Sequence, residues 1–192
     1  MARRSKEREI KRPIITVIGE GPTERYYFQH LRDIKHYRYN CKPRFFSQQS
    51  LKEMHRLIGE VLDNNGVAMC IFDADVTRQD DKTTKEMYNR IFDDYGKRED
   101  VILCPSMPSI EFWFLLHYLN TNKYYASSDA VIEVLNKYHD FEKNSKYLEK
   151  IQWVEKLCSD NKLDTACARA ESFGTKGESF SEIYKAIEIF EH

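Results

Sequence analysis

The chain has 192 residues, of which 41% are hydrophobic and 32% are charged, and 30 lysines and arginines nearly balance 31 aspartates and glutamates. This length suits one ordinary domain with an appended helical subdomain, and it is too short for two large domains. The composition excludes a membrane protein and an intrinsically disordered chain. Because the net charge is only −1, any nucleic-acid or membrane partner must be held by local charge.

The cysteines and the first residues bear on the cellular compartment. The five cysteines are odd in number, widely spaced and free of any Cys-x-x-Cys pair, which argues against a zinc ribbon and a disulfide framework. A reducing cytoplasm is therefore the expected compartment. The basic start is not followed by an apolar segment, so we expect no signal peptide. No later stretch approaches the roughly 18 apolar residues that a membrane span needs.

Residues 1–12 carry six basic side chains against two glutamates and precede the first apolar run. We interpret them as a mobile basic arm. The arm is either a solubilising tail or a segment that contacts phosphates without reading sequence. In the second case the predicted nucleic-acid-binding residues are Arg3, Arg4, Lys11 and Arg12.

The first half of the chain alternates between strand-like and helix-like patterns. Short apolar runs predict buried strands at 14–18, before a glycine, at 67–72, after a glycine, and at 101–104, before Pro105, and a weaker strand is predicted at 42–46. Helical spacing of apolar residues predicts helices at 23–36, 51–64 and 84–95, the second of them opened by a capping box of Ser50 and Glu53. Alternation of this kind is typical of parallel βαβ units, so we expect an α/β fold with a mostly parallel sheet flanked by helices.

Beyond Pro108 the pattern becomes mostly helical. Ser179 and Glu182 form a second capping box, at the start of the last predicted helix. The predicted helices are 110–119, 128–138, 147–160, 162–173 and 180–190. We therefore divide the chain into a basic arm (1–12), an α/β catalytic core (13–120) and a helical extension packed on or beside that core (121–192).

Acidic side chains gather where the predicted strands end. Glu20 and Glu24 follow the first strand, Asp73 and Asp75 follow the 67–72 strand, and Glu111 begins the helix after the third. Since ligands collect at the carboxyl ends of parallel strands, we expect these carboxylates to share one rim. Their mutual repulsion calls for a counter-charge, and an all-oxygen set suits Mg²⁺ or Mn²⁺ rather than Zn²⁺. An ordinary solvated acidic turn is the alternative for each motif taken alone.

Other motifs favour structural roles. The loop 174–177 lacks the spacing of a phosphate-binding loop and does not follow a strand, so we expect a connecting loop. His117 is expected to be a packed or hydrogen-bonded histidine, with a catalytic or substrate role as the alternative. The neighbouring aromatic residues should mostly face the core, with base stacking as the alternative: Phe112, Trp113, Phe114 and Tyr118.

Three sequence blocks resemble the signature blocks of the RloB-like proteins. They are Val17-Ile18-Gly19-Glu20-Gly21-Pro22-Thr23-Glu24 with Tyr27-Phe28, then Phe72-Asp73-Ala74-Asp75, then Ser106 and Ser109 with Glu111-Phe112-Trp113-Phe114-Leu115-Leu116-His117-Tyr118. The likeness covers roughly residues 13–175, and the lead-in 107–110 departs from the usual family pattern. It implies a Toprim-like fold related to the OLD-type nucleases. It also implies a role in bacterial phage defence and abortive infection, often beside an AAA-type ATPase gene.

The resemblance assigns a role to each acidic residue. Glu20 matches the Toprim glutamate, Asp73 and Asp75 match its metal-binding pair, and Glu24 and Glu111 match additional acids of this branch. The implied metal ligands are Glu20, Asp73, Asp75 and Glu111.

The reaction that the resemblance implies is phosphodiester cleavage assisted by one or two Mg²⁺ ions. Glu20 or Glu24 would act as general base. Lys143 resembles the family's lysine after the aromatic helix and would neutralise developing charge, and a solvent-facing lysine is the alternative.

Two functions follow from these observations. The first is a Mg²⁺-dependent nuclease, or nuclease subunit, in cytoplasmic antiviral defence. The second is a non-catalytic nucleic-acid-binding or regulatory subunit that docks on an ATPase partner. The sequence leaves open whether the substrate is DNA, RNA or tRNA, how many metal ions bind, and whether the chain forms a homo-oligomer.

Overall fold

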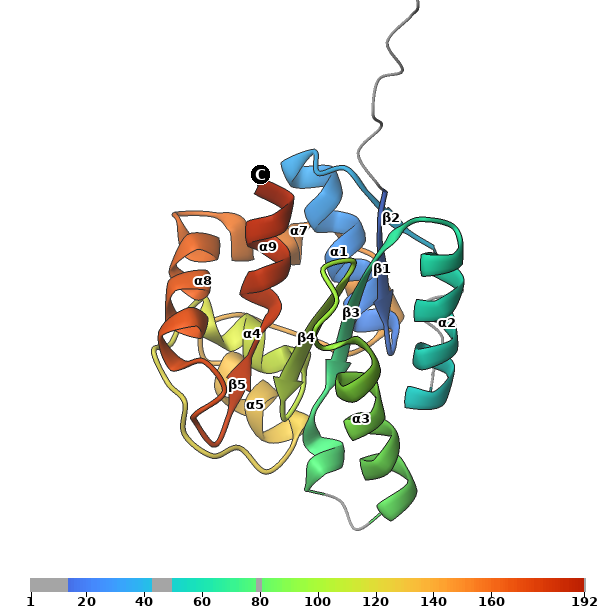
Figure 1. Ribbon diagram of the computed structural model, residues 1–192. Helices are drawn as coiled ribbons and strands as arrows, with labels where there is room; N and C mark the ends of the chain where they lie inside the picture. Colours follow the sequence, from blue (N-terminus) through green and yellow to red (C-terminus); the bar gives the residue numbers. More distant parts are fainter. Residues whose placement is uncertain (1–13, 43–49, 79–80, 192) are drawn as a thin grey trace, which may run out of the picture.

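The computed structural model of the protein describes residues 14–42, 50–78 and 81–191 (Figure 1). A single five-stranded sheet in the order β2-β1-β3-β4-β5 forms its centre. The first four strands of this order run parallel, and β5 pairs with β4 in the antiparallel direction. The strands are β1 (Ile15–Gly19), β2 (Tyr39–Cys41), β3 (Val67–Asp73), β4 (Val101–Met107) and β5 (Phe180–Ser181). The α/β fold with a mostly parallel sheet is thus confirmed.

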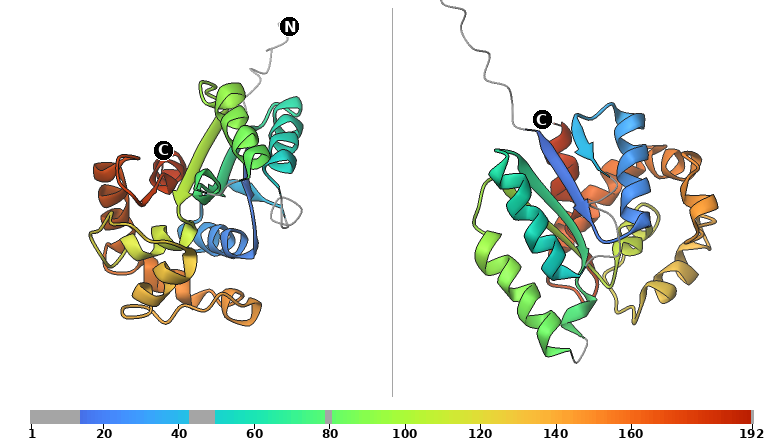
Figure 2. Two further views of the ribbon diagram at one scale, coloured as in Figure 1. Left: turned by 90° about the horizontal axis from the view of Figure 1, so that it is seen from below. Right: turned by 90° about the vertical axis from the view of Figure 1, so that its right-hand side faces the viewer.

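Helices cover both faces of the sheet. In Figure 2, α2 (Leu51–Asp63) and α3 (Lys82–Tyr95) lie on one face, and α1 (Pro22–Lys35) and α9 (Ile183–Glu191) lie on the other. The remaining helices lie on the side of α1 and α9. They are α4 (Ile110–Leu116), α5 (Ser128–Leu135), α6 (Ser145–Leu148), α7 (Gln152–Cys158) and α8 (Lys162–Phe173), and a short 3₁₀ helix, η2 (Asp75–Thr77), follows β3.

The apolar runs become strands because both faces of the sheet are covered. Residues 68–72 of β3 are all buried, as expected for a central parallel strand between two helical layers. The core extends from the sheet into α4, whose seven residues are all buried. There the Trp113 Nε1–H donates a hydrogen bond to the Tyr27 hydroxyl at 2.8 Å, which satisfies both polar groups inside the core.

Two predicted strand boundaries are wrong. The second strand lies at Tyr39–Cys41, earlier than the predicted 42–46, and residues 43–49 lie outside the described residues. β4 does not end before Pro105 but continues to Met107. Pro105 cannot donate a backbone hydrogen bond, because proline has no N–H. Its carbonyl still accepts one, from the backbone N–H of Glu182 at 2.9 Å, so the strand can continue through it.

The predicted 180–190 helix is also wrong at its start, because Phe180 and Ser181 form β5. Ser181 and Ser106 share a buried hydroxyl hydrogen bond of 2.8 Å, so this pair fixes β5 against β4. Ser179 is not a helix cap; its Oγ accepts from the backbone N–H of Tyr125. Glu182 pairs with the Lys185 ammonium instead of capping.

Other helix boundaries also differ from the predicted ones. The predicted 147–160 helix is two short helices, α6 and α7, and the predicted 110–119 and 128–138 helices end at Leu116 and Leu135. The predicted 162–173 helix is confirmed as α8, and the Ser50 side chain caps α2 as its capping box predicts.

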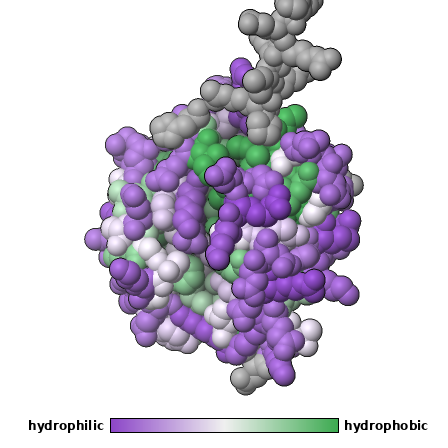
Figure 3. Space-filling model, viewed as in Figure 1, coloured by the Kyte–Doolittle hydropathy of each residue, from purple (hydrophilic) through white to green (hydrophobic). Residues whose placement is uncertain are grey.

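The surface agrees with the high content of charged residues. Figure 3 shows a largely hydrophilic face with a small hydrophobic region in the upper part of the view. In the described part of the chain, no helix combines the length and the apolar composition needed to cross a bilayer. All five cysteine thiols are free.

Candidate functional site

The carboxyl ends of β1 and β3 bring the first two acidic motifs together. The parallel register places Gly19 opposite Ile71, so Glu20 emerges next to the end of β3. The backbone N–H of Asp73 donates a hydrogen bond to Glu20 Oε1 at 3.3 Å. This contact ties the turn after β1 to the end of the central strand.

Glu24 occupies the first turn of α1 and is buried. Its Oε2 accepts a hydrogen bond from the backbone N–H of Gly21 at 3.0 Å, and this N–H would otherwise lack a helical partner. The carboxylate also lies at the positive end of the helix, where negative charge is favoured. Glu24 is therefore held on the same rim as Glu20 by the start of α1.

Glu111 belongs to the first turn of α4 and has no exposed surface. The Ser109 hydroxyl donates to its Oε2 at 2.6 Å, and the Lys143 ammonium lies 2.9 Å from its Oε1. One residue earlier in α4, the backbone N–H of Ile110 donates to Asp73 Oδ1 at 3.1 Å. The start of α4 is thus joined directly to the end of β3.

Asp75 and Lys143 act on the other carboxyls of the cluster through their charges. Asp75 opens η2, and its charge contributes to raising the pKa of the Glu20 carboxyl. Lys143 acts in the opposite sense, because its charge lowers the pKa values of Glu20, Glu24 and Asp73. Five acidic side chains and this lysine therefore interact across one edge of the sheet.

Three carboxyls of the acidic cluster hold protons more tightly than isolated carboxyls do: Glu20, Glu24 and Asp73. Burial, and then the charge of Glu24, raise the pKa of Glu20 from 4.5 to about 8. Burial is also the main reason why the pKa of Glu24 rises to about 7, and why that of Asp73 lies well above its ordinary range. Buried carboxylates that share a site can all ionise only at a large cost in free energy unless positive charge lies near them. An added cation would therefore stabilise the ionised form of this cluster.

The donor chemistry of this edge fits a hard divalent cation. Carboxylate oxygens are the ligands that Mg²⁺ and Mn²⁺ prefer, and the shortage of positive charge favours a cation. Across residues 14–42, 50–78 and 81–191, however, no three His, Cys, Asp or Glu side chains form a ready-made metal site. The carboxylates instead accept hydrogen bonds from backbone N–H groups or a hydroxyl, or pair with Lys143; they belong to Glu20, Glu24, Asp73 and Glu111. Binding of a metal ion would therefore require these side chains to rotate.

Comparison with known protein families matches nearly the whole chain to one family. The model of the family described as RloB-like protein matches residues 15–189, from β1 into α9. The chain belongs to the RloB-like family. No curated protein and no solved structure matches it. The matched range contains the five acidic residues and Lys143, whereas the four predicted arm residues precede it.

The histidine, the aromatic residues and the 174–177 loop of this RloB-like protein have the structural roles predicted for them. His117 is buried, its Nδ1 lies 3.0 Å from the Trp113 carbonyl oxygen, and burial lowers its pKa to about 3. The aromatic side chains at 112–114 are wholly buried, and the 174–177 segment connects α8 to β5. Arg3, Arg4, Lys11 and Arg12 lie outside the described residues.

The sequence interpretation missed one polar partner in the site. Ser109 is buried, and its hydroxyl is the hydrogen-bond donor to the Glu111 carboxylate. The signal available in the sequence was the Ser-x-Glu spacing at the predicted start of α4. That spacing alone indicates a helix start rather than a contact with a buried acid.

Proposed function

We propose that this RloB-like protein is a metal-dependent phosphodiesterase that cleaves nucleic acid. The observation that carries the proposal is the excess of buried carboxylates over cations at the carboxyl edge of the parallel sheet. Ligand sites of open α/β sheets lie at this edge. A cluster that needs positive charge and offers only oxygen donors suits Mg²⁺ or Mn²⁺.

The residues have distinct roles in this proposal. The ligands would be Glu20, Asp73, Asp75 and Glu111. A bound ion would supply an activated water and stabilise charge on the scissile phosphate. Glu20 and Glu24, with pKa values of about 8 and 7, can exchange protons near neutral pH, as a general base must. Lys143 is half-exposed and can pair with a phosphate oxygen.

The biological setting in the proposal rests on the family resemblance. It comprises a Toprim-like core, bacterial antiviral defence by abortive infection, action on DNA or RNA, and an AAA-type ATPase partner; the cytoplasm is proposed separately, from the cysteine pattern. Self-association of the chain belongs to the same group of proposals.

A second candidate is a non-catalytic nucleic-acid-binding or regulatory subunit of an ATPase-containing complex. One observation favours it: the carboxylates are already engaged by N–H groups, Ser109 and Lys143, and do not converge as metal ligands. In that case the acidic edge would sense a ligand or respond to the partner without cleaving a phosphodiester.

The deciding experiment incubates the full chain with plasmid DNA and with total RNA in Mg²⁺, in Mn²⁺ and in EDTA. The test variant is Asp73→Asn with Asp75→Asn, and the charge-matched control is Asp33→Asn with Asp63→Asn, at two exposed positions. We expect metal-dependent cleavage by the wild type and the control and none by the test variant. The melting temperature of each variant should show that it folds.

Cleavage retained by the folded test variant would overturn the metal-site proposal. Absence of cleavage by the wild type, repeated with the candidate ATPase present, would favour the regulatory subunit. A rise in melting temperature with Mg²⁺ that is missing from the test variant would still place the ion at this edge.

A further inference from the structure

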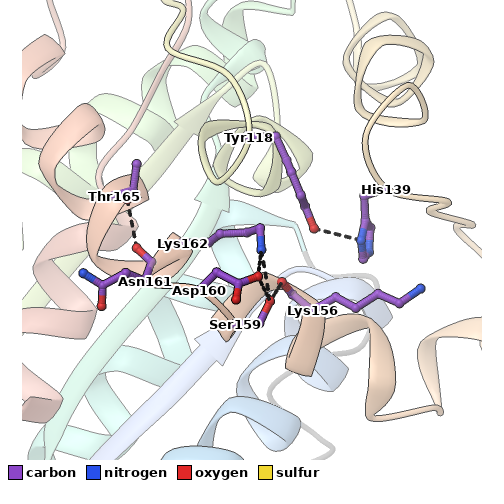
Figure 4. Close-up of polar contacts among 8 residues, drawn as sticks. All are labelled: Tyr118, His139, Lys156, Ser159, Asp160, Asn161, Lys162 and Thr165. Atoms are coloured by element: carbon purple, nitrogen blue, oxygen red, sulfur yellow. Dashed lines mark hydrogen bonds and ion pairs between the residues drawn. The ribbon is translucent and has the colours of Figure 1, made fainter.

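A pocket lies at the opposite end of α4 from the acidic cluster. It has a volume of about 460 Å³ and is lined by side chains that follow α4, α5 and α7 or belong to α7 and α8. Figure 4 shows the Tyr118 hydroxyl directed at His139, the Lys162 ammonium turned to Asp160 and Ser159, and the Lys156 side chain extending away from Lys162. The volume is within the range of small-ligand sites, about 300–1,000 Å³.

One wall of the pocket is aromatic. The rings of Tyr118 and Tyr138 stack with centroids 6.1 Å apart and an interplanar angle of 15°. The hydroxyls of Tyr118 and Tyr147 hydrogen bond to the two ring nitrogens of the buried His139, at 3.0 and 3.2 Å. Tyr138 is nevertheless 50% exposed. A ring that is fixed on one side and open on the other is suited to stacking on a nucleobase.

The remaining lining is rich in lysine. Lys137, Lys156 and Lys162 line the pocket together with a single acidic residue, Asp140. Within the described part of the chain, neither Lys137 nor Lys156 forms an ion pair, whereas Lys162 pairs with Asp160 at 2.7 Å. Asp160 is 83% exposed, so water screens this pair and an anion can compete for Lys162. Lysine ammonium groups in this arrangement suit a phosphate.

We propose that this pocket binds a nucleoside phosphate, with the base on Tyr138 and the phosphate paired with the lysines that line the pocket, Lys156 and Lys162. The ligand is either a free nucleotide or a nucleotide unit of a single strand, since both present the same base and phosphate. The pocket is separate from the acidic edge, because α4 has seven residues and so spans about 10 Å between them. The proposal concerns binding and does not rest on the proposed nuclease activity.

The test is calorimetric titration of the full chain in EDTA, which prevents metal-dependent cleavage. The four probes are adenosine 5′-monophosphate, adenosine, inorganic phosphate and a single-stranded hexadeoxyadenylate. We expect the monophosphate or the hexamer to bind at least about tenfold more tightly than adenosine or phosphate alone, because only those two engage both halves of the pocket. Binding of the monophosphate identifies a free-nucleotide site, and binding of the hexamer alone identifies a strand site.

Variants locate the binding. Lys156→Gln with Lys162→Gln, and separately Tyr138→Ser, should each weaken binding about tenfold or more while the melting temperature shows a folded chain. The matched control, Lys146→Gln with Lys150→Gln, removes two exposed lysines outside the lining and should bind as the wild type does. Asp73→Asn with Asp75→Asn should leave binding of the monophosphate unchanged.

Three results would overturn the proposal. They are no binding of either nucleotide probe, equal weakening by the pocket and control lysine variants, and loss of binding in the Asp73→Asn/Asp75→Asn variant alone.

Discussion

The Lys143 ammonium lies 2.9 Å from a carboxylate oxygen of Glu111, which has no exposed surface, while the lysine side chain is 49% exposed. The pair joins the segment between α5 and α6 to the first turn of α4. The same ammonium lowers the pKa values of Glu20, Glu24 and Asp73, so one lysine acts on four of the five acidic residues at this edge.

Replacing Lys143 by methionine should destabilise the fold. Loss of one partner leaves a buried charge uncompensated, which costs about 3–5 kcal/mol for a fully buried pair. Because the lysine is half-exposed and screened by water, we expect a loss of about 1–2 kcal/mol in the free energy of unfolding. Urea denaturation at pH 8 measures it.

Lys146→Met is the matched control, since Lys146 is exposed and close in sequence. Adding Glu111→Gln to Lys143→Met should recover part of the lost stability, because the uncompensated charge is then removed. Strictly additive losses in this double variant would mean that the ion pair contributes nothing.

Stability should fall as pH rises between about 6.5 and 8, above the range in which the unfolded chain takes up the proton that the folded His117 does not bind. Over this window the folded chain keeps protons on Glu20, Glu24 and Asp73 that the unfolded chain releases. Since the native state then binds more protons than the unfolded state, the free energy of unfolding decreases with pH. Glu20→Gln should make this decrease shallower, most clearly between pH 7 and 8. Thermal unfolding at a series of pH values measures the slope.

The exposed Glu86→Gln serves as the control for that series. Mg²⁺ at pH 8 should raise the melting temperature of the wild type more than that of Glu20→Gln, because a cation relieves the same repulsion. Identical pH profiles for Glu20→Gln and the wild type would show that Glu20 does not hold the raised pKa.

Ser109→Ala should cost about 1–3 kcal/mol in the free energy of unfolding. The substitution removes the 2.6 Å hydrogen bond from the hydroxyl to Glu111 and leaves a buried carboxylate oxygen without that donor. Ser172→Ala, at an exposed serine, is the control and should stay within about 0.5 kcal/mol of the wild type. Equal stability of the two variants in urea would exclude a role for Ser109 in holding Glu111.

Deleting residues 1–12 tests the basic arm. If the arm binds phosphates, nucleic-acid binding should weaken, and the salt dependence of log K should flatten by about 0.9 for each duplex phosphate that is no longer neutralised. A full-length variant with Arg3, Arg4, Lys11 and Arg12 changed to glutamine should behave like the deletion. Fluorescence anisotropy over a range of salt concentrations measures both effects, and unchanged binding would leave the arm as a tail.

Most strands and helices could be predicted from local patterns. β3 and α8 follow from a continuous apolar run and from helical spacing, and the start of α2 follows from the Ser50 cap. These signals are local, because burial on both faces of a strand, or on one stripe of a helix, constrains every residue of the element. β5 could not be predicted in this way, since two residues carry no periodicity and pair only because β4 lies beside them.

The sequence by itself determined the α/β class, the family, and the placement of Glu20, Asp73 and Glu111 beside strand ends or a helix start. These properties depend on residue order, which sets where each strand stops. Only the tertiary structure decided which groups those carboxylates contact, that Lys143 reaches Glu111, and that three lysines line a pocket beside Tyr138. Such contacts join residues that are distant along the chain, and their geometry depends on how the helices pack against the sheet.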